Sequence, residues 1–567
     1  MTRSPLVRWL LIALVALLIA LAARALWQQG SPPNEPAPTV AAGSATPDAT
    51  VAPDASTPPD VVTTPAPSEE TATAEPTPET ATGAATAEPP VPGEVPAPTL
   101  FDQPWADRSL WSQGLVESAR PRAEALDGAT IYHMRIDVAE GYRRVAGEQE
   151  VHYTNTETEP LDEIYFRLFP NLFGGAITID ALTLNGEPVT GQLELEESAL
   201  RLPLAQPLEP GASVVVGMTY RVEVPEVNEQ NYGAFAFTAD VLALAHAYPL
   251  IPAYDESGWN VEIPAPSGDV IYADSSFYLV ELTMPEGTTM AASGTVIEEQ
   301  GADGRTTQTI VAGPVRDFYM AGSPAFVEVS EQRGETTLRS YALPGQEEVN
   351  AEVLRIGAET LELFNALYGP YPYTELELAS TPNLALGIEY PGVVVMTERL
   401  YREDGFAGNV PRGALLESTV VHEVGHQWFY STVGNDQLDA PWLDEALAQY
   451  VTYRYYETLG AQAAAGFEAS LRDRWERVGE ADIPIGLPVE EYNAQEYGAI
   501  VYGRGPLFFI DALEEEIGQD TVDDFLRAYY DQFYFGIATG EGMREVAERT
   551  CGCDLNALWD AWVLPEE

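Results

Sequence analysis

The apolar and polar positions divide the 567-residue chain into stretches of different texture. An apolar run at residues 9–23 is followed, from about residue 28 to residue 99, by Pro, Ala, Thr and Glu with almost no aromatic side chains. From residue 130, short runs alternate apolar and polar positions, which is typical of half-buried strands. From residue 350, the apolar positions recur at helical spacing instead. The pattern therefore predicts a β-rich part followed by a largely helical part.

Six runs in the middle of the chain are predicted to be strands separated by Gly, Pro and Asn turns. Short strands at this regular spacing are typical of an antiparallel β-sandwich. We assign the N-terminal β-sandwich domain to residues 101–343, with a lead-in segment before the first strand at Thr130. The six runs are residues 130–140, 163–170, 213–224, 276–287, 288–299 and 317–329.

Residues 344–567 are predicted to form an α+β domain that is mostly helical. The run at residues 350–369 has apolar positions at helical spacing. Residues 375–381 and 391–396 are short apolar runs, and we expect them to be strands of a mixed sheet. The remaining segments favour helices, and the candidate chemistry lies among them.

The N-terminus predicts a location outside the cytoplasm. Arg3 and Arg8 precede the apolar run, and a small-x-small site follows at residues 23–25, as in a secretory signal. Continued to Trp27, the segment is nearly long enough to span a membrane, although an arginine interrupts it. Residues 1–27 are therefore either a cleaved signal peptide or an uncleaved membrane anchor. Residues 28–100 are predicted to be a disordered stalk, because they cannot bury enough apolar surface to fold.

The charge balance excludes one class of partner. The chain has 88 acidic and 28 basic side chains and a net charge of −60, and it contains no lysine. Such a surface repels phosphate backbones, so we expect no nucleic-acid partner. Cys551 and Cys553 are the only cysteines, and we interpret them as incidental because a lone CxC forms neither a disulfide framework nor a zinc site.

Two of the five histidines stand four residues apart in the sequence VHEVGHQWFY, residues 421–430. On a helix, His422 and His426 project from one face and can share a metal ion. Imidazole suits Zn²⁺, which takes a third protein ligand and keeps a position for water. Glu423 lies beside this site and is placed to take a proton from the water. The other three histidines stand singly among apolar neighbours and are interpreted as structural.

The predicted third ligand is Glu445, in the segment PWLDEALAQYVTYRYY at residues 441–456. Pro441 lies near the start of this segment, and apolar residues give the segment one apolar face. Glu445 then falls on the first turn of a second helix. That helix can pack beside the first and direct a carboxylate at the metal.

Two of these segments, HEVGHQWF and WLDEALAQY, resemble the aminopeptidase N-like zinc metallopeptidases, the gluzincin group with HExxH and a distal glutamate. Residues 248–260 and 290–296 resemble signature stretches of that family's N-terminal β-domain. The resemblance spans residues 130–564 and implies a thermolysin-like catalytic domain, one zinc ion and peptide substrates. The family usually reads WLNEGFA, so Asp444 and Leu447 depart from its pattern.

Two further positions carry over from the resemblance. Tyr502 matches the tyrosine of the family's Y-x-K-G segment, with Arg504 in place of the lysine, and this implies a hydrogen bond to the oxyanion. Tyr497 is the alternative for that role. Glu389 matches the glutamate of the family's G-x-M-E-N segment, which holds the free amino terminus of the substrate. In residues 386–390 (LGIEY) only this glutamate is kept.

These inferences predict a zinc aminopeptidase in which Glu423 is the general base, Tyr502 stabilises the oxyanion and Glu389 binds the substrate ammonium. Two alternatives stay open. The first is a zinc endopeptidase with an open cleft, because the segment around Glu389 departs from the family and no further helical domain follows. The second is a non-catalytic binding protein displayed on a stalk. Membrane contact is expected only through an uncleaved N-terminal segment, and the sequence leaves the oligomeric state undetermined.

Overall fold

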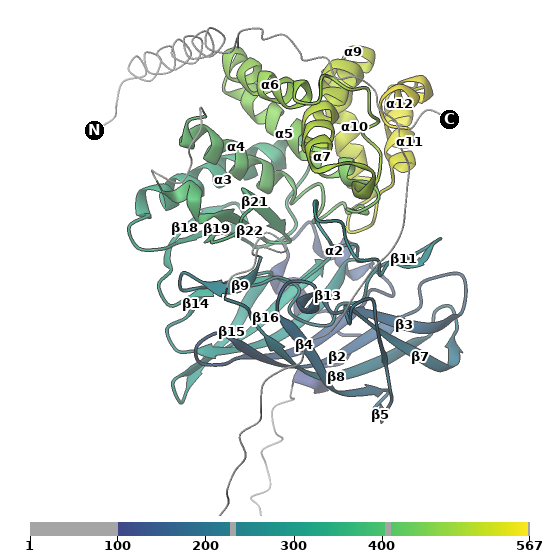
Figure 1. Cartoon of the computed structure of the whole chain (residues 1–567), viewed down its shortest axis with the longest axis vertical. Coiled ribbons are helices and arrows are strands. Elements are labelled where there is room, and N and C mark those ends of the chain that lie inside the picture. Colours follow the sequence, from purple (N-terminus) through teal and green to yellow (C-terminus); the bar gives the residue numbers. More distant parts are fainter. Residues whose placement is uncertain (1–99, 227–233, 403–409, 565–567) are drawn as a thin grey trace, which may run out of the picture. The chain divides into compact units, whose positions relative to one another are not determined.

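The computed structural model describes residues 100–226, 234–402 and 410–564, which belong to one compact unit, 97–567. The predicted signal or anchor segment and all but the last residue of the predicted stalk lie outside the described residues. None of the described helices has the length and apolar content needed to cross a bilayer. The strands of the N-terminal part lie below the helices of the C-terminal part in Figure 1.

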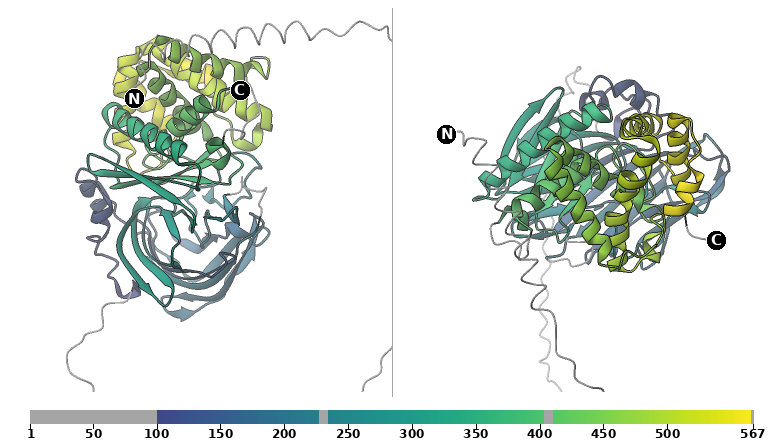
Figure 2. Two further views of the ribbon diagram at one scale, coloured as in Figure 1. Left: turned by 90° about the vertical axis from the view of Figure 1, so that its left-hand side faces the viewer. Right: turned by 90° about the horizontal axis from the view of Figure 1, so that it is seen from above.

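The N-terminal part is built around an eight-stranded sheet of order β15-β16-β13-β1-β2-β8-β4-β5. Its inner strands follow the expected alternation: along β2, buried positions regularly alternate with more exposed ones. Figure 2 shows these strands curving around a common core. The strands are β1 (Ile131–Val138), β2 (Arg144–Thr154), β4 (Ala176–Leu184), β5 (Glu187–Pro188), β8 (Ser213–Glu223), β13 (Ser276–Pro285), β15 (Thr295–Ala302) and β16 (Arg305–Val315).

Three smaller sheets complete this β-rich part. They have the orders β3-β7-β6, β14-β17-β10-β9 and β11-β12. Their strands are β3 (Leu161–Arg167), β6 (Gln192–Glu194), β7 (Ala199–Leu208), β9 (Phe235–Thr238), β10 (Val241–Leu244), β11 (Tyr254–Asp255), β12 (Gly258–Trp259), β14 (Thr289–Ala292) and β17 (Met320–Ser323).

The expected β-rich N-terminal domain is present, but the prediction of an antiparallel sheet is wrong at one place. The first strand, β1, pairs in parallel with β13, with Ile131 opposite Phe277. The chain forms β2 to β12 between these two strands, and β13 then enters the main sheet in the same direction as β1. The other pairs of neighbouring strands in this sheet are antiparallel.

A five-stranded mixed sheet crosses the predicted domain boundary at residue 343. Its order is β18-β19-β20-β22-β21, and β19–β20 and β20–β22 are parallel pairs. By sheet membership, therefore, β18 and β19 belong with the C-terminal part. A parallel pair needs a long crossover, and helix α3 provides it between β19 and β20. The strands are β18 (Val327–Arg333), β19 (Thr336–Ala342), β20 (Glu375–Thr381), β21 (Gly387–Tyr390) and β22 (Val393–Thr397).

Helices pack on this sheet and extend beyond it. The predicted strands at residues 375–381 and 391–396 correspond to β20 and β22, and α3 and α4 pack against strands of the sheet. One short α-helix, α2 (Arg120–Glu124), lies in the lead-in segment. The others are α3 (Glu347–Leu367), α4 (Arg412–Gly425), α5 (Glu445–Thr458), α6 (Ala461–Glu476), α7 (Ala494–Ala499), α8 (Gly505–Leu507), α9 (Glu514–Ile517), α10 (Gln519–Gln532), α11 (Gly540–Cys551) and α12 (Asn556–Trp562).

A buried arginine joins the two parts of the unit. Arg316, at the end of β16, is only 2% exposed. Its guanidinium donates hydrogen bonds to the carbonyl oxygens of Ala273 (3.2 Å), Tyr430 (2.8 Å) and Gly536. The last two acceptors lie in the C-terminal part. Five fixed donors on one planar group satisfy carbonyls from three segments at once.

The two cysteines differ from their sequence interpretation. Cys551 and Cys553 form a disulfide at the C-terminal end of α11. Gly552 between them has a φ of 67°, a left-handed conformation that glycine adopts without steric cost. This turn brings the two side chains to the same side of the chain, which the spacing alone did not indicate.

Candidate active site

Helix α4 presents the two predicted histidine ligands. It ends at Gly425, and His426 follows as its C-terminal cap, with its backbone N–H bonded to the carbonyl of His422. This turn places both rings on one face, with 3.1 Å between the two Nε2 atoms. His422 and His426 are buried, so their nitrogens have little access to water.

Glu445 completes the cluster from the first turn of α5. Its Oε2 atom lies 3.1 Å from His422 Nε2 and 3.4 Å from His426 Nε2. The side chain of Asp444 caps this helix by accepting a hydrogen bond from the Glu445 backbone N–H at 2.8 Å. The cap fixes where the helix begins, and so it fixes the direction of the Glu445 carboxylate.

The three converging atoms fit a zinc ion. Tetrahedral zinc with bonds of about 2.0–2.1 Å holds its ligands roughly 3.3 Å apart, which is close to the spacings of these atoms. Burial lowers the pKa of His422 to about 4, so its ring is neutral and offers a lone pair. The other nitrogen of His426, Nδ1, lies 3.2 Å from the carbonyl oxygen of Phe429. A proton on Nδ1 donated to this carbonyl leaves Nε2 free for a metal.

Glu423 lies beside this cluster. One of its carboxylate oxygens, one of Glu389 and a ring nitrogen of His426 lie within 4.8 Å of one another. Burial raises the pKa of the Glu423 carboxyl well above its usual range, and the neighbouring Glu389 carboxylate adds to the shift. A carboxylate that gains a proton readily is suited to accept one during a reaction.

Tyr502 reaches the cluster from a π-helical segment, Ile500–Arg504. Its hydroxyl donates a hydrogen bond to Glu445 Oε1 at 2.5 Å, so it lies at the edge of the metal-ligand set. Tyr497, the alternative, also lines the cavity, and its ring centroid is 5.6 Å from that of Tyr502. Of the two, Tyr502 is the one bonded to a predicted ligand. Arg504 points elsewhere and pairs with Asp482.

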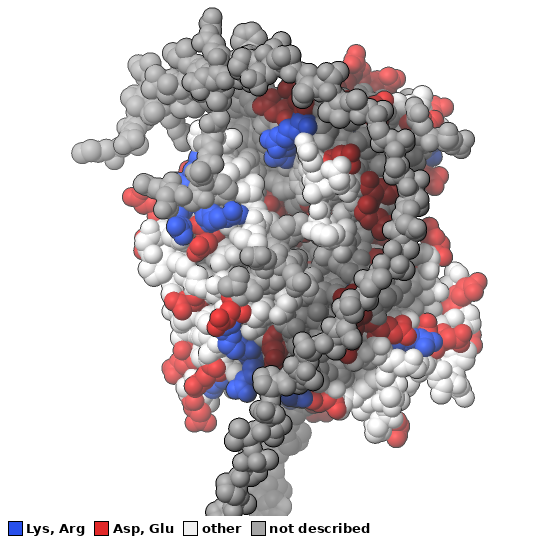
Figure 3. Space-filling model, in the orientation of Figure 1, with Lys and Arg blue, Asp and Glu red and all other residues white. Residues whose placement is uncertain are grey.

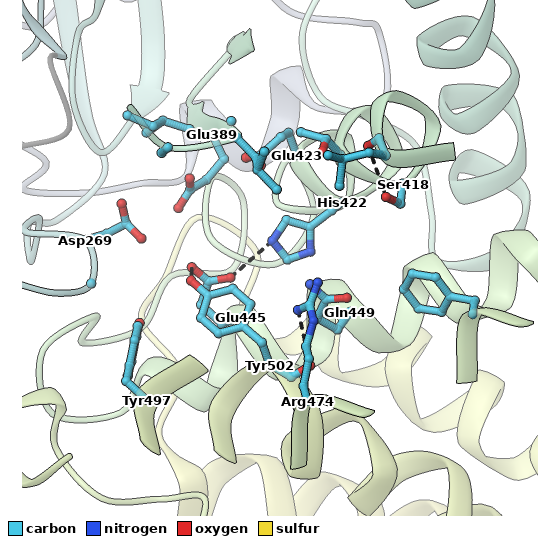
Figure 4. A pocket seen from close by; sticks show the side chains of 18 residues that line it. Asp269, Glu389, Ser418, His422, Glu423, Glu445, Gln449, Arg474, Tyr497 and Tyr502 are labelled. Atoms are coloured by element: carbon cyan, nitrogen blue, oxygen red, sulfur yellow. Dashed lines mark hydrogen bonds and ion pairs between the residues drawn. The ribbon is translucent and has the colours of Figure 1, made fainter. Parts of the chain in front are cut away.

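Glu389 projects from β21 on the other side of the cluster, and a second carboxylate lies close to it (Figure 4). Carboxylate oxygens of Asp269, Glu389 and Glu445 lie within 4.8 Å of one another. Asp269 comes from the loop between β12 and β13 of the N-terminal part. Burial raises the pKa values of both Asp269 and Glu389, and the Glu389 charge adds to the shift of Asp269. These two carboxyl groups therefore form a pocket that favours a cation.

Gln437 holds two of the acidic groups in place. Its side-chain amide donates to Glu389 Oε1 at 3.2 Å and to Asp444 Oδ2 at 3.0 Å. Burial raises the pKa of Asp444 to about 8, and the Glu445 charge contributes. Asp444 thus links the cap of α5 to the Glu389 side of the site. In the sequence this residue stood out only as a departure from the family pattern.

Most of the groups proposed to act on a substrate line one cavity of about 320 Å³. The predicted site residues Glu389, His422, Glu423, Glu445 and Tyr502 line it, and His426 lies behind them. Two charged residues of the lining, Asp269 and Arg474, are not predicted from the sequence. Neither belongs to a local motif, since one lies in a loop and the other on a helix with no distinctive pattern.

Comparison with known families identifies the C-terminal part. Residues 353–562 match the peptidase family M1 domain. The chain carries an M1 peptidase domain. This confirms the resemblance to the aminopeptidase N-like zinc metallopeptidases, and the family together with the donor set indicates zinc as the metal.

The curated relatives that match this M1 domain include longer aminopeptidases. Aminopeptidase 2 of Candida albicans is 25% identical over 244 residues, which are 41% of this chain and 26% of that protein. Probable aminopeptidase 1 of Saccharolobus solfataricus is 20% identical over 275 residues, which are 47% of this chain and 35% of that protein. The chain thus matches about a quarter to a third of the length of these relatives.

A solved structure shares the fold over most of the chain. The M1 zinc metallopeptidase of Deinococcus radiodurans, crystallised as a variant bound to a Tyr-Ser-Ala substrate, superposes with a TM-score of 0.57 at 20% identity. The superposition covers 77% of this chain and 95% of the other. The arrangement of a β-rich part followed by an M1 domain is therefore shared with that protein.

Proposed function

We propose that this chain is a zinc-dependent aminopeptidase that removes residues from the amino termini of peptides. The observation that carries the proposal is a pair of carboxylates, half-buried Asp269 and buried Glu389, next to the His422, His426 and Glu445 cluster. A metal-ligand cluster alone supports any hydrolase. A cation pocket beside it supports one that recognises a substrate ammonium.

His422, His426 and Glu445 would hold the zinc ion, which when bound polarises the scissile carbonyl and makes water a better nucleophile. Glu423 accepts a proton from the attacking water and passes it to the leaving amine. The Tyr502 hydroxyl donates a hydrogen bond to the oxyanion as charge develops on the former carbonyl oxygen. Glu423 and Tyr502 reach the cavity from helical segments of the fold, so their side chains need little rearrangement to act.

Glu389 and Asp269 decide which bond is presented. An ammonium held between the two carboxylates is fixed by charge-assisted hydrogen bonds. The first peptide carbonyl follows it by one residue, and this places the first bond at the metal cluster. Selectivity for the amino terminus then results from how the substrate is positioned, because the catalytic residues act on whichever peptide bond lies at the metal cluster.

The proposal extends to the setting of the domain. We infer a thermolysin-like catalytic part, supported by the HExxH helix and the glutamate at the start of the next helix. We also infer a location outside the cytoplasm, with residues 1–27 as signal or anchor and residues 28–100 as a stalk. The basic and apolar composition of the first segment and the Pro-rich composition of the second support this inference.

The test is the pattern of products from an unblocked peptide of about ten residues. The proposal predicts sequential loss of residues from the amino end, detected by mass spectrometry. Activity should disappear after chelation and return with added zinc, and Glu423→Gln should be inactive throughout. Internal fragments formed first would identify an endopeptidase instead. The absence of any cleavage by the zinc-loaded protein would support the binding-protein alternative.

A further inference from the structure

The active-site cavity contains a cation that the proposed mechanism does not use. Arg474, on α6, is the only arginine among the described residues that line the cavity, and the chain has no lysine. Figure 4 shows the Arg474 side chain beside Gln449, on the side of Glu445 away from Asp269 and Glu389. The cavity therefore has an acidic end and a basic end, with the metal-ligand cluster between them.

Arg474 has no carboxylate partner among the described residues. Its guanidinium makes a single long contact of 3.5 Å with the carbonyl oxygen of Tyr502. By contrast, the buried arginine Arg454 lies 2.8 Å from the carboxylate of Asp523. Burial lowers the pKa of Arg474, because desolvation disfavours the charged guanidinium. A guanidinium with five donors and so few acceptors is ready to bind an anion.

The direction in which the substrate lies determines which part of it could supply an anion to Arg474. With the ammonium between Asp269 and Glu389 and the scissile carbonyl at the cluster, the leaving portion of the peptide extends toward Gln449 and Arg474. A short peptide ends there in a free carboxylate. The rest of the lining carries four carboxyl groups, which would repel a substrate carboxylate unless a cation compensated for them.

We propose that Arg474 binds a carboxylate of the substrate on the leaving-group side of the scissile bond. The inference rests on the proposed aminopeptidase function. It makes the chain selective for zwitterionic short peptides, whose two charges match the two ends of the cavity. The carboxylate is either the carboxyl terminus of a dipeptide or tripeptide or an acidic side chain of the residue after the scissile bond, and both present the same chemistry to the guanidinium.

The experiment compares matched substrates that differ only in this charge. For one N-terminal residue X, the set is X-Ala and X-Ala-Ala as free acids, the same two peptides as carboxamides, and X-Asp-NH₂. Loss of one charge-assisted contact is expected to raise KM and lower kcat/KM of the amides by roughly 10- to 100-fold. Recovery with X-Asp-NH₂ would assign the carboxylate to a side chain, and no recovery would assign it to the carboxyl terminus.

The variants locate the effect at Arg474. Arg474→Gln should lower kcat/KM for the free acids by the same factor and leave the amides unchanged, and Arg474→Lys should restore part of the loss. Arg477→Gln is the matched control, because it removes the same charge from the exposed end of α6. Equal cleavage of acids and amides by the wild type, or an equal loss on both in Arg474→Gln, would overturn the proposal.

A binding measurement separates this proposal from the proposed function. In zinc-loaded Glu423→Gln protein, calorimetry should show tighter binding of X-Ala than of X-Ala-NH₂, and the difference should vanish when Arg474→Gln is added. If the wild type cleaves neither substrate but this difference is present, the aminopeptidase proposal fails and the carboxylate subsite stands. If cleavage occurs without the difference, the subsite is wrong and the aminopeptidase proposal stands.

Discussion

Gly387 lies directly against the side chain of Glu423. A Cβ atom added at residue 387 would come within 2.4 Å of the Glu423 carboxyl carbon and of its Oε1. Its three nearest neighbours all belong to this one side chain. Gly387 lies on the same strand as Glu389, and because it has no side chain it makes room for Glu423, the proposed general base.

Gly387→Ala is therefore expected to displace the Glu423 carboxylate and leave the fold intact, because the end of a flexible side chain can move. We expect kcat to fall at least about tenfold, since a misplaced base transfers the proton poorly, while zinc content and Tm stay close to wild type. Steady-state kinetics with metal analysis checks this. Gly413→Ala is the control, because no atom lies within 4 Å of its added Cβ. Unchanged kcat in Gly387→Ala would contradict the placement of the base.

Tyr502→Phe should lower kcat more than it raises KM, because its hydrogen bond to the oxyanion is strongest in the transition state. The expected loss is about 10- to 1000-fold. Tyr497→Phe, one ring away in the same cavity, should stay within a few-fold of wild type. The opposite ranking of the two variants would transfer the role to Tyr497.

The zinc ligands are tested by metal content. Purified wild-type protein is expected to hold one zinc ion per chain after dialysis, and His422→Ala and Glu445→Ala should lose it. Glu423→Gln should retain it, since that carboxylate lies beside the ligand set and is not part of it. Atomic absorption or a colorimetric zinc assay gives the ratio directly. Stoichiometric zinc in His422→Ala would show that the ligand set is wrong.

The residues that could be predicted from the sequence are those with a local signal. The spacing of His422 and His426 determines a shared helix face, and the proline before Glu445 indicates a helix start. Tyr502 and Glu389 came from resemblance alone. Asp269 could not be found, because it reaches the cavity from a loop of the other part of the unit. Only the tertiary fold brings these segments together.

The same limit applies to the fold. The alternating runs predicted β-strands correctly, but the alternation of one strand carries no information on its partner. It could not show that β1 pairs in parallel with β13, or that β18 and β19 join the sheet of the following domain. The burial of Arg316 could not be predicted either, because its hydrogen-bond acceptors are carbonyl groups that are distant in the sequence, including those of Tyr430 and Gly536.

Arg316→Met should destabilise the junction between the two parts. The substitution leaves buried carbonyl groups without donors, which costs about 3 kcal/mol or more. Thermal unfolding should show a lower Tm, and residual folded protein should keep its zinc. Arg316→Lys should recover only part of the lost stability. Its ammonium can donate to some of the carbonyl groups, but it cannot reach all three as a guanidinium does. A Tm equal to wild type in Arg316→Met would contradict the role assigned to this residue.

Glu389 and Asp269 are proposed to bind a substrate ammonium beside the zinc site. The most direct test is kcat/KM for one peptide with a free and with an acetylated amino terminus, measured on the wild type and on Glu389→Gln. In the wild type, acetylation should lower kcat/KM by at least about a hundredfold, because the contact with the ammonium is lost and the two carboxylates are left without a compensating cation. Glu389→Gln should remove most of the discrimination by slowing only the free peptide. Equal cleavage of both peptides by the wild type would contradict the account.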